Sequence, residues 1–150
     1  MRVLFLLTII VSLSACSFYE RQEYRIAAAS RADVPRVREI LRDVATQAGI
    51  PKNVGGYHSD GEMIGWYTMS NVGLHGTWHR GVQIDRHGNI YRPWEIEIEL
   101  SRSDWPPPLA FRRAYRALTP ALSSAFGRRL EHPPRPLPGE ATAERIITVY

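Results

Sequence analysis

Two histidines and two glutamates are the residues whose types and spacing suggest chemistry. His75 and His79 are four positions apart, and so are Glu95 and Glu99. Imidazole nitrogens and carboxylate oxygens bind Zn²⁺ or Cu²⁺, so one surface carrying all four could hold a metal ion. In a strand, however, residues four apart are separated by roughly 13 Å. The sequence therefore favours weak cross-strand histidine–glutamate pairs, and a metal site remains the alternative.

A second group of residues could bind an anionic ligand without catalysing a reaction. Arg112, Arg113 and Arg116 fall within a helical pattern, and Trp105 lies just before it. The planar, permanently charged guanidinium suits phosphate or carboxylate, so these residues could face anionic lipid or a cell-wall carboxylate. The alternative is an ordinary solvated helix face. Trp66, Tyr67, Trp78 and Trp94 could likewise line a recognition surface, although such aromatic residues more often pack in a core.

Recognisable catalytic motifs are missing from the sequence. It contains no P-loop, no GxSxG, HExxH or CxxC motif and no dinucleotide fingerprint. Formal net charge is +4, and the basic residues are arginines apart from Lys52. No nucleic-acid-binding motif accompanies this charge. We therefore expect a protein that is not an enzyme, has no catalytic residues and no cofactor, and does not bind nucleic acid.

Cys16 is the single cysteine, and it follows an apolar run. Arg2 supplies a positive start, residues 3–11 are apolar except for Thr8, and small residues follow. This order is typical of a secretory signal, and the run is too short for a membrane span of roughly 20 residues. With one cysteine, the exported domain has no internal disulfide and depends on its core.

The segment Leu13-Ser14-Ala15-Cys16 resembles the lipobox of bacterial lipoproteins at all four positions. The resemblance covers about the first 16 residues and implies cleavage before Cys16, with fatty acylation, such as palmitate, of the new terminus. Acylation by more than one chain gives stable membrane anchoring. Ser17 after the cysteine implies an outer-membrane lipoprotein facing the periplasm, with the inner membrane or the cell surface as alternatives. An ordinary signal peptide is the competing interpretation.

The remaining chain predicts one small α+β domain over residues 33–150, after a signal peptide at 1–15 and a tether at 16–32. Apolar residues at helical spacing predict a helix over 33–49, with Asp33 as its N-cap and Gly49 at its end. A second helix is predicted over 104–127, capped by Asp104, kinked or split at Pro120 and ended by Gly127. A proline-rich segment covers 133–138.

Three antiparallel strands are predicted between the helices, at about 63–70, 75–85 and 89–100. The second and third share a turn that places Asp85 opposite Asn89, because only an even register keeps the glutamates out of the core. His79 then faces Glu95, and Pro93 interrupts the ladder. The inner face is expected to comprise Trp78, Val82, Ile84, Trp94, Ile96 and Ile98, leaving Glu95, Glu97 and Glu99 in water. A short strand at 24–28 is possible, and a C-terminal strand at 146–150 could extend the three-stranded sheet to four strands.

These features together predict a non-enzymatic envelope lipoprotein whose partners are the membrane, through Cys16, and a protein or another envelope component. An assembly factor and an immunity or inhibitor protein are narrower forms of this expectation. The alternative class is a small envelope hydrolase or metal-binding protein that uses the face carrying His75, His79, Glu95 and Glu99.

Overall fold

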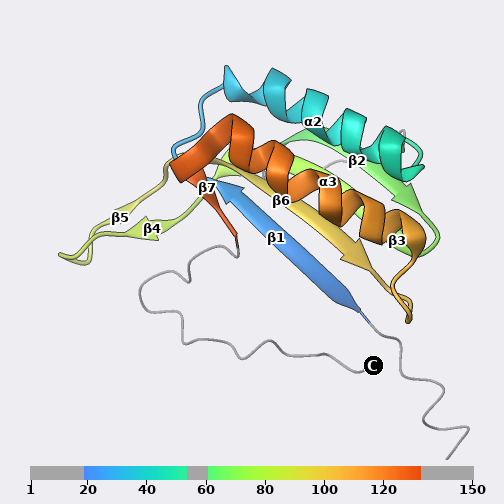
Figure 1. The fold of residues 1–150 in the computed structure, drawn as a ribbon. Helices are drawn as coiled ribbons and strands as arrows, with labels where there is room; N and C mark the ends of the chain where they lie inside the picture. The colour runs from blue at the N-terminus through green and yellow to red at the C-terminus, as the bar shows by residue number, and fades with distance from the viewer. Residues whose placement is uncertain (1–18, 54–60, 133–150) are drawn as a thin grey trace, which may run out of the picture.

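A computed structural model describes residues 19–53 and 61–132, and within them the chain has an α+β fold with two helices on one face of an antiparallel sheet (Figure 1). The five-stranded sheet has the order β2-β3-β6-β1-β7, and β4 and β5 form a separate two-stranded ladder. The strands are β1 (Glu20–Ile26), β2 (Gly61–Met69), β3 (Val72–Arg80), β4 (Gln83–Ile84), β5 (Ile90–Tyr91), β6 (Trp94–Arg102) and β7 (Leu130–Glu131). The helices are α2 (Asp33–Ala48), α3 (Leu109–Phe126) and the short 3-10 helix η1 (Gly127–Arg129). The expected signal peptide, Cys16, the proline-rich segment and the expected C-terminal strand lie outside the described residues.

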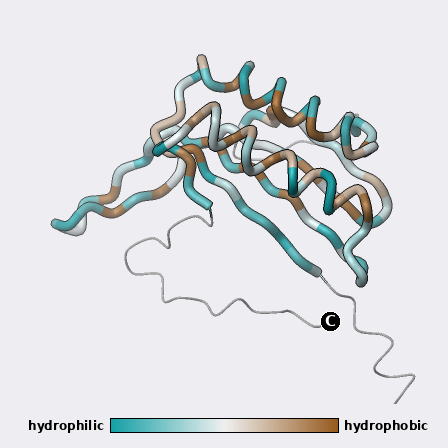
Figure 2. Tube along the Cα trace, in the orientation of Figure 1, coloured by the Kyte–Doolittle hydropathy of each residue, from teal (hydrophilic) through white to brown (hydrophobic). Residues whose placement is uncertain are grey.

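The core lies between the sheet and the two helices. Ile96, Ile98 and Leu100 of β6 are fully buried, since this strand runs through the middle of the sheet. All seven apolar residues expected on the first helix are buried: Val34, Val37, Ile40, Leu41, Val44, Ala45 and Ala48. Figure 2 shows hydrophobic positions recurring along both helices between hydrophilic ones, as an amphipathic helix requires.

Helix α2 ends as expected but begins differently. Gly49 adopts φ +75°, and the N–H of Ile50 donates to Ala45 at 2.8 Å, which closes the last turn. At the start, Ala32 occupies the N-cap position without a side-chain cap, so the expectation for Asp33 is wrong. The Asp33 carboxylate instead accepts from the N–H of Ser30 at 2.7 Å and pairs with Arg129.

Helix α3 runs from Leu109 across Pro120, so of the two predicted effects of this proline, a kink or a split, the split does not occur. Its N-cap position is Pro108, so Asp104 does not cap it. Gly127 ends it, as expected, at φ +53°. Phe111, Ala114, Leu118, Leu122 and Phe126 face the core, and this long buried stripe holds the helix in place despite the hydrogen bond that a proline removes.

The predicted register between the second and third strands is confirmed. His79 pairs with Glu95, Thr77 with Glu97 and His75 with Glu99, and the same register continues in β4 and β5. The N–H of Asp85 donates to Asn89 at 2.9 Å across a turn in which Gly88 has φ +83°. The ladder breaks between β5 and β6, at Pro93, as a residue without an N–H predicts.

Strand β1 lies in the region that the sequence analysis assigned to a tether. Its seven residues pair with β6 along their whole length, from Glu20 opposite Arg102 to Ile26 opposite Ile96. Only Tyr24 and Ile26 bring large apolar side chains to the core, so the segment carries little alternation of its own. The backbone hydrogen bonds to the side of β6 that does not pair with β3 place β1 in the sheet.

Strands β4 and β5 project from the body of the domain (Figure 1). We call residues 82–92, which include these strands, together with Trp94 the arm. Val82, Ile84 and Trp94, which we expected to face the helices, are exposed here. The expectation is wrong because the hairpin continues beyond the ends of both helices, where no second layer from the described residues covers it. Trp78, Ile96 and Ile98 lie closer to the body and are buried as predicted.

Candidate functional site

The open face of the sheet carries the histidines and glutamates as two separate cross-strand pairs. His75 Nε2 lies 4.0 Å from a Glu99 oxygen, and His79 Nε2 lies 3.7 Å from a Glu95 oxygen and 3.5 Å from Glu97. The two histidines are four residues apart on β3, so the four side chains do not converge on one point. Within residues 19–53 and 61–132, no group of three histidine, cysteine or acidic side chains could hold a metal ion.

Glu95 is the unusual member of this face. Its side chain was expected in water, but the residue is only 7 % exposed, and its Oε2 has no hydrogen-bond partner. The carboxylate lies over Gly81, where a Cβ would overlap it. Burial raises the pKa of Glu95, and the nearby charges of Arg25 and His79 only partly oppose this shift. The sequence alternation identified the correct face of β6 and missed the burial, because Gly81 leaves room for the side chain.

Ion pairs engage other charges on the open face. Arg25 contacts Glu131 at 2.7 Å, and Arg21 contacts Glu99 at 3.3 Å and also pairs with Glu23. Such pairs are partly exposed and contribute little stability individually. The open face therefore carries acidic and basic side chains paired with one another.

The expected binding residues gather where α3 begins. Arg112, Arg113 and Arg116 are exposed on α3, and Trp105 is 69 % exposed in the loop before it. The buried guanidinium of Arg102 lies 5.4 Å from the ring centroid of Trp105 and 5.3 Å from that of Phe111. Arg102 also donates to Glu20 through Nε at 2.8 Å, so this loop is tied to the start of β1.

The other aromatic candidates divide between core and surface. Tyr67 and Trp78 are buried, Trp66 is partly buried, and Trp94 is exposed while stacking on Trp78 at a centroid separation of 4.2 Å. They therefore do not form one recognition surface.

The arm is the surface that sequence reasoning missed. Val82, Ile84, Ile90, Tyr91 and Trp94 are exposed large hydrophobic residues, and Ile90 is 67 % exposed. Figure 2 shows hydrophobic positions on both strands of the arm. Pro93 and Gly81, which interrupt the ladder, were the available signal that the hairpin leaves the layered body at this point.

Exposed large hydrophobic residues thus concentrate at opposite ends of the sheet. The arm lies where β1 ends, whereas Trp105 and Leu109 lie where β1 begins (Figure 1). Tyr19 and Met69 belong to the second group, since they adjoin Glu20 and the turn into β3. Of the exposed large hydrophobic residues, Tyr115 stands apart on α3.

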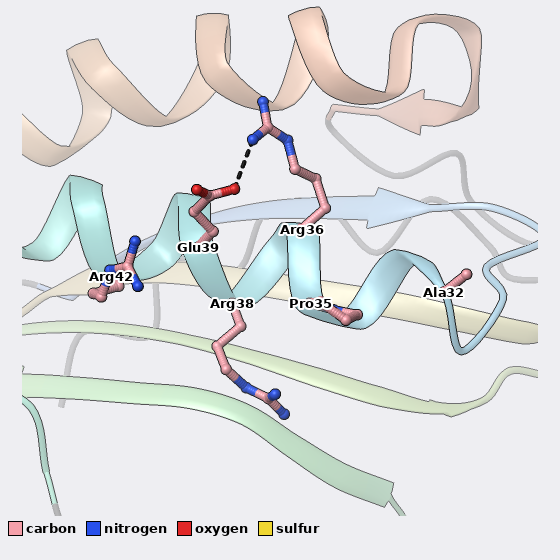
Figure 3. Close-up of a pocket in the computed structure, with 6 residues that line it drawn as sticks. All are labelled: Ala32, Pro35, Arg36, Arg38, Glu39 and Arg42. Atoms are coloured by element: carbon pink, nitrogen blue, oxygen red, sulfur yellow. Dashed lines mark hydrogen bonds and ion pairs between the residues drawn. The ribbon is translucent and has the colours of Figure 1, made fainter.

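A pocket on the outer side of α2 adds no catalytic group. Ala32, Pro35, Arg36, Arg38, Glu39 and Arg42 line it (Figure 3). Arg36 pairs with Glu39 at 2.7 Å, and Arg38 extends to β2, where its Nε donates to the carbonyl of Ile64 at 3.2 Å. All of its lining residues come from one helix and its preceding residue, and Arg38 also pairs with Glu62 of β2 at 3.7 Å.

Comparison with known proteins supplies no family for this chain: no family model, no curated protein and no solved structure matches it. Neither helix in the described part of the chain has the length and apolarity of a membrane span.

Proposed function

We propose that this protein is a non-enzymatic lipoprotein of the bacterial cell envelope, anchored through Cys16, that binds a protein partner through the arm formed by residues 82–92 and Trp94. The lipobox-like segment Leu13-Ser14-Ala15-Cys16 supports the anchor. The exposed apolar surface of the arm carries the binding proposal. Soluble domains rarely leave large hydrophobic residues clustered on a projection unless another molecule covers them.

The arm has the chemistry of a protein-binding element. Ile84 and Ile90 are cross-strand partners and therefore lie on one face. Trp94 and Tyr91 are residue types that dominate binding energy at interfaces, and Arg80 lies 5.0 Å from the Trp94 ring centroid. The mixture of aliphatic, aromatic and arginine side chains fits a protein surface with an apolar centre and a polar rim.

The tip of the arm is internally held, which favours binding without a large ordering cost. Asp85 Oδ1 accepts from the N–H groups of His87 at 2.8 Å and of Asn89 at 2.9 Å. The side-chain hydrogen bond from Asn89 Nδ2 at 2.9 Å, followed by these backbone bonds, lowers the pKa of Asp85, so the carboxylate stays ionised as an acceptor to lower pH than usual. The arm can therefore present its apolar residues in one arrangement.

In vivo photo-crosslinking tests the proposal. A photoreactive residue at position 90 or 91 should give a discrete protein adduct, and one at the exposed α2 position Thr46 should not. Ile90→Ser should abolish the adduct formed from position 91 while leaving the free energy of unfolding within about 1 kcal/mol, because Ile90 is outside the core. Absence of an adduct at both arm positions would contradict the proposal. A toxin or lytic enzyme in the adduct would indicate immunity, and an envelope assembly protein would indicate scaffolding.

The second candidate is a hydrolase or metal-binding protein, and the buried Glu95 carboxylate with its unpartnered oxygen is the observation that favours it. Replacing His75, His79, Glu95 and Glu99 together by alanine decides between the two. If binding is the function, the variant should still complement a deletion strain. Tight Zn²⁺ or Cu²⁺ binding by the parent in calorimetry, lost in the variant together with complementation, would favour the second candidate.

A further inference from the structure

The end of the sheet opposite the arm has a composition that fits a membrane surface. Tyr19, Trp105 and Leu109 are exposed there, and Arg112 and Arg113 follow within the first turns of α3. We call these five residues the Trp105 surface. Tryptophan and tyrosine concentrate at the boundary between lipid headgroups and acyl chains, where one end of the ring is apolar and the other is wet.

The charges at this end favour an anionic surface. Glu20 is neutralised by the buried Arg102. Two other acids lie nearby: Asp104 accepts a hydrogen bond from Asn71 Nδ2 at 2.5 Å, and Glu99 accepts one from the Tyr19 hydroxyl at 3.2 Å and pairs with Arg21. Among the described residues no ion pair engages Arg112, Arg113 or Arg116. Basic residues held near an anionic bilayer each contribute about 1 kcal/mol of attraction.

The chain length before β1 determines which end of the domain can reach the bilayer. Only three peptide units separate Cys16 from Tyr19, which span at most about 10 Å. An acylated Cys16 therefore holds the start of β1 close to the headgroups. The arm lies beyond the other end of this seven-residue strand, which is roughly 20 Å long.

We propose that the Trp105 surface rests against a bilayer containing anionic phospholipid, so that the arm points away from the membrane. This inference rests on the proposed acylation of Cys16. It assigns the two exposed apolar ends to different partners: phospholipid at the start of β1 and protein at the arm. The Arg102 contacts to Glu20 and Trp105 make the Trp105 loop and the anchored strand one rigid unit.

Single labelled cysteines test the orientation. Cys16 is the only native cysteine, so after its acylation a cysteine introduced by Leu109→Cys, Ile90→Cys or Thr46→Cys is the only free thiol. The full mature lipoprotein, extracted from membranes and placed in vesicles, is labelled with an environment-sensitive dye. Nitroxide-headgroup lipids then quench dyes that lie at the membrane surface. Phosphatidylcholine vesicles with and without phosphatidylglycerol are compared.

We expect the dye at position 109 to be quenched several-fold more than dyes at positions 90 and 46, and more strongly in the anionic vesicles. Arg112→Gln with Arg113→Gln should reduce the quenching at 109, whereas Arg36→Gln with Arg42→Gln, which removes the same charge from α2, should not. Far-UV circular dichroism and thermal melts establish that each variant remains folded. Equal quenching at 109 and 90, stronger quenching at 90, or no quenching at either position would overturn the proposal.

The same experiment separates this inference from the proposed function. If Cys16 is not acylated, each variant takes up two dyes and the parent takes up one, which contradicts the anchor. One dye per variant with no preference for position 109 leaves the anchor intact and overturns the orientation alone.

Discussion

Adjacent residues of β6 illustrate how one position in a strand differs from the next. Ile96 is fully buried between sheet and helices, whereas Glu97 lies on the open face and is exposed. Their side chains point to opposite faces because the strand has a period of two. Glu95 shares the face of Glu97 but is buried, so residues of the same type on the same face have different energetics.

Replacing Ile96 by alanine should destabilise the domain by about 2–5 kcal/mol, since it removes buried methyl groups and leaves a cavity. Glu97→Ala should change the free energy of unfolding by less than about 0.5 kcal/mol. Denaturant melts of the two variants measure both values. A larger loss for the glutamate variant would show that the two faces of β6 have been assigned the wrong way round.

Glu95→Gln should stabilise the protein at neutral pH. Because burial raises the folded-state pKa of Glu95, its stabilising contribution is fully present below the ordinary value of 4.5 and is lost as pH rises through the folded-state value. Removing the charge should therefore help above that range and have no effect well below pH 4.5. Denaturant melts across pH, with Glu97→Gln as the exposed control, test this. A destabilised Glu95→Gln at neutral pH would mean that Arg25 and His79 stabilise the carboxylate more than burial penalises it.

At the scale of elements, one ion pair joins segments from opposite ends of the described chain. Asp33 is the first residue of α2, and Arg129 is the last residue of η1. An Arg129 guanidinium nitrogen lies 2.6 Å from an Asp33 carboxylate oxygen. Arg129 also donates to the carbonyl of Ala28 at 3.2 Å, beside the connection between β1 and α2. The pair therefore fastens the start of the first helix to the segment that leads into β7.

Breaking the pair between Asp33 and Arg129 should lower the free energy of unfolding at neutral pH, and this effect should weaken at acidic pH. The Arg129 hydrogen bond lowers the pKa of Asp33 from 3.8 to about 2, so the stabilisation is present above pH 3.8 and is lost as pH falls towards 2. Arg129→Met should cost about 1–2 kcal/mol near pH 7, towards the lower value because the Arg129 side chain is 43 % exposed. The difference from the parent in denaturant melts should shrink as pH falls through 2, leaving only the loss of the Arg129 hydrogen bonds to backbone carbonyls. Arg128→Met, at the exposed neighbouring arginine, is the control and should show no such pH dependence.

At the scale of the whole molecule, two exposed apolar surfaces lie at opposite ends of the sheet. One surface lies where β1 begins, and the arm extends from the other end (Figure 1). With the proposed acylation of Cys16, a short connection to β1 and a projecting arm would together give the domain a direction relative to a membrane. That polarity suits a protein that is held at a bilayer and reaches a partner in the adjacent aqueous space.

Cys16→Ser should abolish acylation and membrane retention. The motivation is the lipobox-like segment, whose cysteine sulfur would carry an acyl chain. Labelling with a radioactive fatty acid and fractionation of cells compare the variant with the parent. Ser17→Ala, which keeps the cysteine, is the matched control and should remain labelled. Unchanged labelling of the serine variant would exclude Cys16 as the anchor.

The sequence alone determined the buried face and the C-terminal end of α2 and the register between β3 and β6. Each follows from local periodicity: the apolar spacing of residues 34–48, and the even numbering of Trp78 and Ile96 on the buried side. Gly49 and Gly88 provided the backbone freedom that ends the helix and closes the turn. These features need only neighbouring residues, so a pattern in the chain reveals them.

Tertiary structure alone decided the place of β1, the exposure of the arm and the burial of Glu95. Strand β1 has few apolar residues and is ordered by the edge of β6, which lies some 70 positions later in the chain. Ile84 and Ile90 alternate like core residues, yet they are exposed because both helices end before reaching them. Glu95 alternates like a surface residue, yet it is buried because Gly81 lies beneath its carboxylate. Alternation specifies the face of a strand, and what covers that face depends on segments distant in sequence.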